Sequence, residues 1–153
     1  MSPRALAACL SLIACVAALA TAAPARAQSV AAQAGAEALA RRCAATGGRP
    51  REASGLVRAI DLAGRPATAL DAQRFSCQGA AAVDCGPFGC KLSIYLDGAA
   101  PVFETYVKAW RARGGKLEIM RVGAYCAAAG ESCSETYQAS GGALPGAGGI
   151  SAL

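Results

Sequence analysis

The sequence contains no histidine, and it is poor in aromatic and charged residues, which make up 5% and 16% of the chain. Without an imidazole, Ser-His-Asp catalysis, Cys-His catalysis and metal binding through histidine are all excluded. Much of the 54% hydrophobic fraction is alanine, so this figure overstates the content of core-forming side chains. The length of 153 residues predicts one small domain.

Basic residues outnumber acidic residues by 15 to 10, but they are scattered. Apart from Arg41-Arg42 and the stretch 108–121, the chain has no dense block of lysine and arginine of the kind that contacts nucleic acid. We therefore expect no nucleic-acid partner. The basic side chains are interpreted as solvated positions on strand faces and at helix ends.

Residues 1–27 have the features of a signal peptide. Arg4 precedes an uncharged apolar run over 5–22, and Ala25-Arg26-Ala27 is a small-x-small cleavage site before Gln28. The pattern predicts a periplasmic or secreted protein with no membrane span after cleavage. An uncleaved transmembrane anchor and a lipoprotein attached through Cys15 are the alternatives.

Six cysteines remain after such cleavage, an even number that predicts disulfides in an oxidising compartment. Fifteen pairings are possible for six cysteines. Spacing favours two short loops and one long link, which are Cys85–Cys90, Cys126–Cys133 and Cys43–Cys77. Zinc is disfavoured because the chain has no C-x-x-C pair and no histidine, so no metal or cofactor is predicted.

One helix is predicted at residues 29–45, where strong helix formers follow Ser29 as a possible N-cap and Gly47-Gly48 end the segment. Downstream, alternation of apolar and polar residues predicts β-structure. The expected strands cover 56–60, about 67–77, 91–97 and 116–122, with a short edge strand around Tyr137.

Residues 102–113 fit two interpretations. Phe103, Tyr106, Val107 and Trp110 have the spacing of a helical stripe. The same segment is rich in β-favouring residues, and Gly114-Gly115 would form a two-residue hairpin turn into 116–122. We favour the strand interpretation.

The predicted fold is therefore mainly β (α+β), with an N-terminal helix and a small antiparallel sheet of four to six strands held by disulfides. The domain would cover 28–138, and the glycine-rich segment 139–153 would be a flexible tail. The expected core is thin, which makes the disulfides important for stability. Its members would be Ile60, Phe75, Leu92, Ile94, Leu96, Phe103, Val107, Trp110, Leu117, Ile119 and Val122.

The chain also resembles a group of small exported bacterial proteins that have no assigned activity. The residues that carry this resemblance lie between 43 and 137: Asp61-Leu-x-Gly-Arg-Pro, Asp71, Phe75-Ser-Cys77, Asp84-Cys85-Gly-Pro-Phe-Gly-Cys90, Gly123-Ala-Tyr-Cys126 and Cys133. The resemblance implies a degenerate VCBS/FG-GAP-like segment followed by a Cys-Gly-x-x-Gly-Cys turn. In such repeats an acidic loop can bind calcium. Here only Asp61 remains of that loop, so we expect a turn residue rather than a calcium ligand.

The preferred functional hypothesis is a non-enzymatic domain that binds an envelope or secreted protein. Pro87 and Phe88, in a loop closed by Cys85 and Cys90, are the candidate binding residues. Phe88 could instead pack back onto the sheet. An inhibitor of a secreted hydrolase, presenting the same loop, is the first alternative.

The second alternative is a carboxylate-dependent hydrolase, because carboxylates are the main acid–base groups available. No local spacing pairs two of them, so no catalytic residue is assigned. The candidates are Glu37, Glu52, Asp61, Asp71, Asp84, Asp97, Glu104, Glu118, Glu131 and Glu135.

Overall fold

The structure is a computed structural model that describes residues 29–96, 99–123, 126 and 132–138. The predicted signal peptide and the predicted tail at 139–153 lie outside these residues. One α-helix, one 3-10 turn and ten strands are described. In chain order they are α1 (Val30–Ala45), β1 (Arg49–Glu52), β2 (Val57–Leu62), β3 (Arg65–Asp71), η1 (Ala72–Arg74), β4 (Phe75–Gln78), β5 (Cys85–Gly86), β6 (Gly89–Tyr95), β7 (Phe103–Val107), β8 (Ala109–Arg113), β9 (Lys116–Val122) and β10 (Ser132–Gln138).

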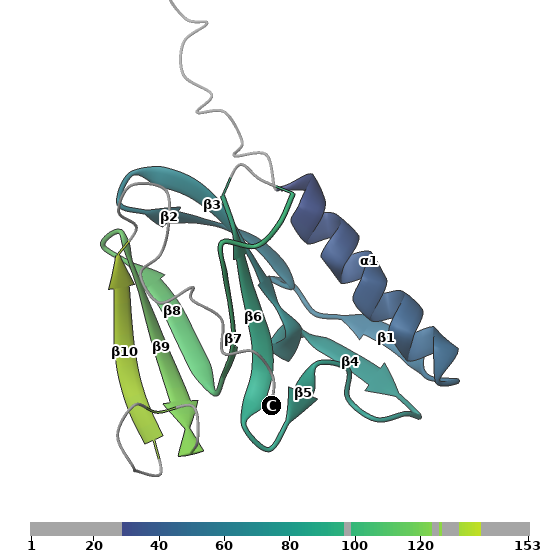
Figure 1. The fold of residues 1–153 in the computed structure, drawn as a ribbon. Helices are drawn as coiled ribbons and strands as arrows, with labels where there is room; N and C mark the ends of the chain where they lie inside the picture. Colours follow the sequence, from purple (N-terminus) through teal and green to yellow (C-terminus); the bar gives the residue numbers. More distant parts are fainter. Residues whose placement is uncertain (1–28, 97–98, 124–125, 127–131, 139–153) are drawn as a thin grey trace, which may run out of the picture.

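The elements form layers around a central sheet (Figure 1). This sheet has five strands, with β2, β3, β6 and β5 in order and β7 paired to β6. On one face lies the three-stranded sheet β10-β9-β8, and on the other lies α1 with the two-stranded sheet β1-β4. The mainly β fold with one N-terminal helix is confirmed. The expectation of a single sheet is wrong, because the strands divide into sheets of five, three and two.

Helix α1 begins and ends close to its predicted limits, but Ser29 does not cap it. No side-chain cap bond forms there, and the backbone N–H of Ser29 instead donates to Thr68 Oγ1 at 3.0 Å. The helix buries Ala32, Ala36, Leu39 and Cys43. Because these side chains are mostly small, the helix lies close to the sheet.

Two hairpins are closed by two-residue turns whose backbone has positive φ, and three of the four turn residues are glycines. Ala63-Gly64 joins β2 to β3, and Gly114-Gly115 joins β8 to β9, with positive φ at all four residues. Such two-residue turns match the twist of antiparallel strands.

The strand interpretation of 102–113 is thus confirmed, except that the segment forms two strands in different sheets, with Lys108 between them. Asp61 lies in β2 rather than in the turn itself, but its carboxylate accepts from the backbone N–H of Gly64 and so stabilises the turn.

The strand expected over 67–77 is interrupted. The η1 turn separates β3 from β4, and the Asp71 carboxylate stabilises it by accepting from the backbone N–H of Gln73 at 3.0 Å. This break lets β4 leave the central sheet and pair with β1, a four-residue strand that the sequence pattern did not indicate. Every residue of β1 is exposed, so β1 has no alternation of apolar and polar positions.

The core is divided in two by the central sheet. The first cluster lies against β8, β9 and β10, whereas the second lies under α1 and includes Phe75. β6 contributes to both, since Leu92 and Ile94 face the first cluster and Tyr95 faces the second. An N-terminal helix on the second face explains why both faces of this strand are buried.

Two predicted core positions need correction. Trp110 is only half-buried at the edge of the first cluster. Val122 is also half-buried. The residue of this pair that faces the core is its neighbour Arg121, which is 7% exposed. Alternation along β9 puts Arg121 on the same face as Leu117 and Ile119. The Arg121 guanidinium donates to the Tyr137 hydroxyl at 2.8 Å and lies 3.3 Å from a Glu135 oxygen.

The three disulfides join the pairs that spacing favoured. Cys43–Cys77 links α1 to β4, Cys85–Cys90 links β5 to β6, and Cys126–Cys133 closes on β10. Within the described residues, no helix has the length and apolar character that crossing a membrane would require.

Candidate functional site

The loop predicted to bind a partner is a minimal hairpin. β5 pairs with the start of β6 so that Cys85 lies opposite Cys90 and Gly86 opposite Gly89. Pro87 and Phe88 are therefore the two residues at the tip, and both are exposed. The Cys85–Cys90 disulfide closes the base of this hairpin, and the ring of Pro87 restricts φ at the tip. Both restraints reduce the conformational freedom of the exposed residues.

Gly89 fixes the loop against β7. Its φ is +113°, a conformation that side chains disfavour, and a Cβ there would lie 2.1 Å from the Val107 carbonyl oxygen. Only glycine permits this approach. The tip is consequently held at a defined distance from the end of β7.

The residue before the loop is anchored to α1. The Asp84 carboxylate accepts two hydrogen bonds from the Arg42 guanidinium, at 2.8 and 2.6 Å. These bonds raise the pKa of Arg42 above its ordinary value. The backbone carbonyl of Asp84 also accepts from the N–H of Lys91 at 2.9 Å, and its φ of 57° turns the chain sharply. A bidentate pair of this type fixes orientation as well as distance.

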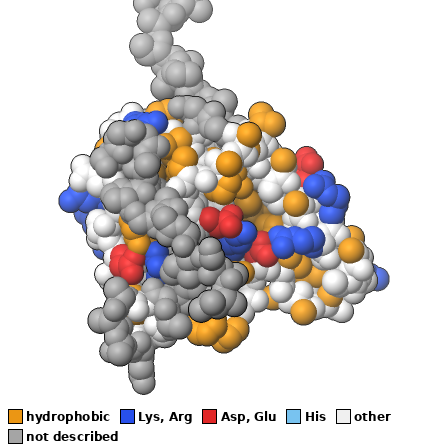
Figure 2. Space-filling view, in the orientation of Figure 1, with side chains coloured by type: hydrophobic (Ala, Val, Ile, Leu, Met, Phe, Trp, Pro, Cys, Tyr) orange, Lys and Arg blue, Asp and Glu red, His pale blue; other side chains and the backbone are white. Residues whose placement is uncertain are grey.

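Phe88 is 40% exposed, which places it with Val30 and Met120 among the exposed large hydrophobic side chains of the described residues. One edge of its ring lies over Gly123, where an added Cβ would be 3.5 Å from Phe88 Cε1. Both interpretations of Phe88 are thus partly realised, because the ring packs against the fold and yet remains 40% exposed. In Figure 2, a hydrophobic patch lies where Figure 1 places the β5–β6 turn.

A hollow with a mixed polar and apolar lining lies between α1 and the strands β6 and β7. Its volume is about 420 Å³, including the open space above it. Two ion pairs line it, Arg42–Asp84 and Lys91–Glu104, the second at 2.7 Å. Figure 2 shows a row of alternating basic and acidic side chains across this face. Tyr95 contributes to the wall, and burial raises the pKa of its hydroxyl.

The structure brings two of the candidate carboxylates, Asp84 and Glu104, to this one hollow, although no spacing in the sequence indicated it. Each has a cation partner, and Glu104 also accepts from the Ser93 hydroxyl at 2.9 Å. Asp97 and Glu131 lie outside the described residues. Within the described residues, no group of three cysteine, aspartate or glutamate side chains is arranged to hold a metal ion.

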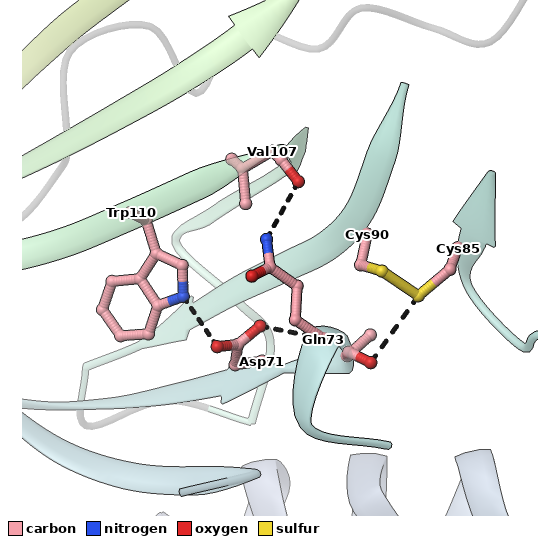
Figure 3. Close-up of a disulfide and its surroundings, with 7 residues drawn as sticks. Asp71, Gln73, Cys85, Cys90, Val107 and Trp110 are labelled. Carbon is pink, nitrogen blue, oxygen red and sulfur yellow. Dashed lines mark hydrogen bonds between the residues drawn. A yellow bond between two sulfur atoms is a disulfide. The ribbon is translucent and has the colours of Figure 1, made fainter. Parts of the chain in front are cut away.

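A second polar cluster, shown in Figure 3, supports the loop from below. Gln73 Nε2 donates to the Val107 carbonyl at 3.1 Å, so the end of β7 that contacts Gly89 is itself fixed by η1. The Ala72 carbonyl oxygen lies 3.6 Å from Cys85 Sγ. No local pattern indicates these contacts, because they join residues 34 and 13 positions apart.

Comparisons of the chain with protein-family models, with curated proteins and with solved structures found no match.

Proposed function

We propose that this chain is an exported, non-enzymatic protein that binds an envelope or secreted protein through the Pro87-Phe88 loop. The observation that carries the proposal is the combination of an exposed aromatic ring with a fully anchored base. Phe88 is 40% exposed, while the residues on either side of the tip are fixed by a disulfide, by Arg42–Asp84 and by Gly89 against Val107.

The physical advantage of such a loop is a low entropic cost of binding. Ordering a flexible side chain or loop opposes association, and a loop that is already ordered avoids much of this cost. An aromatic ring with only two side-chain torsions also buries a large apolar area when it enters a pocket. These two effects make Phe88 the expected anchor of the interface.

Export is supported by the three disulfides together with the signal-peptide pattern. Disulfides persist in oxidising compartments and are rare where thiols are kept reduced. Intact-mass measurement on protein from the envelope fraction tests this part of the proposal. We expect a chain that begins at Gln28 and carries no lipid. A chain that begins at Cys15 with added acyl mass would favour the lipoprotein alternative.

The binding experiment compares two exposed apolar side chains. Immobilised mature protein is incubated with envelope extract, and the partner that it retains is then titrated with wild type, Phe88→Ala and Met120→Ala. Met120 is 39% exposed and lies on β9, so it matches Phe88 in exposure but not in position. Truncation of an aromatic anchor should weaken affinity by about 2 kcal/mol or more, roughly thirtyfold.

The Met120→Ala control should bind like wild type. If Phe88→Ala also binds like wild type, or if both variants are weakened equally, the loop is not the contact surface.

The inhibitor hypothesis is the second candidate, and the same rigid tip favours it. Its two-residue length suits insertion into a deep pocket rather than an extended cleft. Secreted hydrolases assayed with and without the protein distinguish it from simple binding. Inhibition that Phe88→Ala abolishes would support an inhibitor, whereas binding without inhibition would support the first proposal.

A further inference from the structure

The Cys43–Cys77 disulfide is less accessible to solvent than the other two, whose four cysteines are all half-buried. Cys43 has 0% exposure and Cys77 has 8%. Gly48 packs directly onto both sulfurs, since a Cβ at this position would lie 2.2 Å from Cys77 Sγ and 2.9 Å from Cys43 Sγ. Thiol–disulfide exchange requires a thiolate to reach a sulfur atom, so this arrangement excludes external thiols while the fold is intact.

The Cys85–Cys90 disulfide is placed differently. Both cysteines are half-buried, and the three residues that follow Cys85 are exposed. The bond lies at the base of a two-residue hairpin whose tip residues are exposed. An external thiolate can therefore approach it without unfolding of the cores.

We propose that Cys85–Cys90 is a thiol–disulfide exchange site whose reaction partner is a dithiol reductant. The exchange chemistry stands independently of the binding function. Its consequence for the protein rests on the proposed function: reduction would release the base of the loop and so weaken the contact made by Phe88.

The geometry favours attack at Cys90. The Ala72 carbonyl oxygen lies 3.6 Å from Cys85 Sγ and shields that sulfur on one side (Figure 3). A thiolate of the dithiol attacks Cys90 Sγ, the Cys85–Cys90 bond breaks, and Cys85 leaves as a thiolate that takes up a proton. The second thiol of the reductant then attacks the mixed disulfide and releases Cys90. The dithiol is oxidised to its disulfide, and two electrons and two protons end on Cys85 and Cys90.

In the reduced state, the thiol of Cys85 lies close to a hydrogen-bond acceptor. Once Cys85 carries a proton, its S–H can donate to the same Ala72 carbonyl oxygen, at a distance suitable for a sulfur donor. Reduction therefore gives the Cys85 thiol an acceptor that is already in place. The Arg42–Asp84 pair and the pairing of β6 with β3 and β7 do not depend on this bond.

The test is reduction of the folded protein by increasing concentrations of dithiothreitol. Free thiols are then alkylated, and peptide mapping follows each pair separately. We expect Cys85 and Cys90 to be alkylated at a reductant concentration at least about tenfold below that for Cys43 and Cys77, because access differs. The circular dichroism spectrum should remain unchanged over that interval. Opening of both pairs together, or persistence of Cys85–Cys90 until the protein unfolds, would overturn the proposal.

Binding measurements separate this inference from the proposed function. The partner titration is repeated with protein reduced at Cys85 and Cys90 only, and with a Cys85→Ser/Cys90→Ser variant. Weaker binding in both samples is the expected result. If selective reduction occurs but binding is unchanged, the exchange site stands and its proposed effect on binding is wrong, whereas the role of the loop as the contact surface is decided by the Phe88→Ala titration.

Discussion

The indole N–H of Trp110 donates a hydrogen bond of 2.9 Å to the carboxylate of Asp71, and this bond joins the central sheet to the three-stranded sheet. Asp71 is 5% exposed and accepts a second bond from the backbone of Gln73. The outer face of the indole is covered by the Arg58 guanidinium, 4.3 Å from the ring centroid. One carboxylate therefore fixes both the η1 turn and the position of β8.

Trp110→Phe should destabilise the protein, because it removes one donor from a buried carboxylate. We expect a loss of about 1–3 kcal/mol in the free energy of unfolding, measured with urea. Asp71→Asn should also destabilise the protein, since its amide nitrogen would face one of the two N–H donors, which would then lose its acceptor. A double-mutant cycle on these two residues should give a clear coupling energy. Additive effects would mean that the bond contributes nothing to stability.

Gly89→Ala should displace the loop, because its Cβ would overlap the Val107 carbonyl and its φ would be strained. We expect a loss of about 2 kcal/mol or more in stability, since two penalties act at once. Gly86→Ala is the matched control, as it lies opposite Gly89 and has nothing within 4 Å of an added Cβ. Thermal melting of both variants checks the prediction, and equal melting temperatures would contradict it.

Stability should fall at high pH because of Tyr137. Burial, with the hydrogen bond to Glu135, raises the pKa of Tyr137 to about 12. Folding thus favours the neutral phenol, so this contribution is fully present below the unfolded-state pKa of about 10 and is lost as the pH rises through 12. Melting temperatures between those pH values should decline more steeply for wild type than for Tyr137→Phe. Parallel curves for the two proteins would contradict this account.

The Cys43–Cys77 disulfide should contribute most to stability. It closes a loop of 34 residues and holds α1 against the sheet through a buried bond. In the loop-entropy model, replacing both cysteines with alanine should cost about 3–4 kcal/mol, against about 2 for Cys126 and Cys133. Urea unfolding of the two double variants tests this order. If the Cys43/Cys77 variant unfolds like wild type, α1 is an appendage to an independently stable sheet.

Local patterns in the sequence predicted the helix, most of the strands and the three disulfides. These features depend on neighbours in the chain. Helix formers before Gly47-Gly48, alternation over 91–97 and the glycine pair at 114–115 each specify a backbone conformation within a few residues. Cysteine spacing predicted the disulfide pairs for the same reason, because two of the three pairs close short loops.

The division into three sheets, by contrast, was decided by tertiary contacts. The η1 turn is held by Asp71, which in turn is held by Trp110, 39 residues further along the chain. The burial of Arg121 depends on Tyr137 and Glu135 across the β9–β10 pair. No local pattern signals these contacts, because each depends on packing between segments that are distant in sequence.

The same distinction applies to the loop. In the sequence, Pro87 and Phe88 lie between two cysteines and two glycines, and this local pattern already predicts a closed turn. The anchoring of this turn, by contrast, depends on contacts between segments that are distant in the chain. Arg42 from α1, Val107 from β7 and Gln73 from η1 converge on its base, and a chain folds them together only when the helix and both sheets are packed. Rigidity arises from these long-range contacts, since a short disulfide loop alone constrains its own ends but not its orientation on the protein.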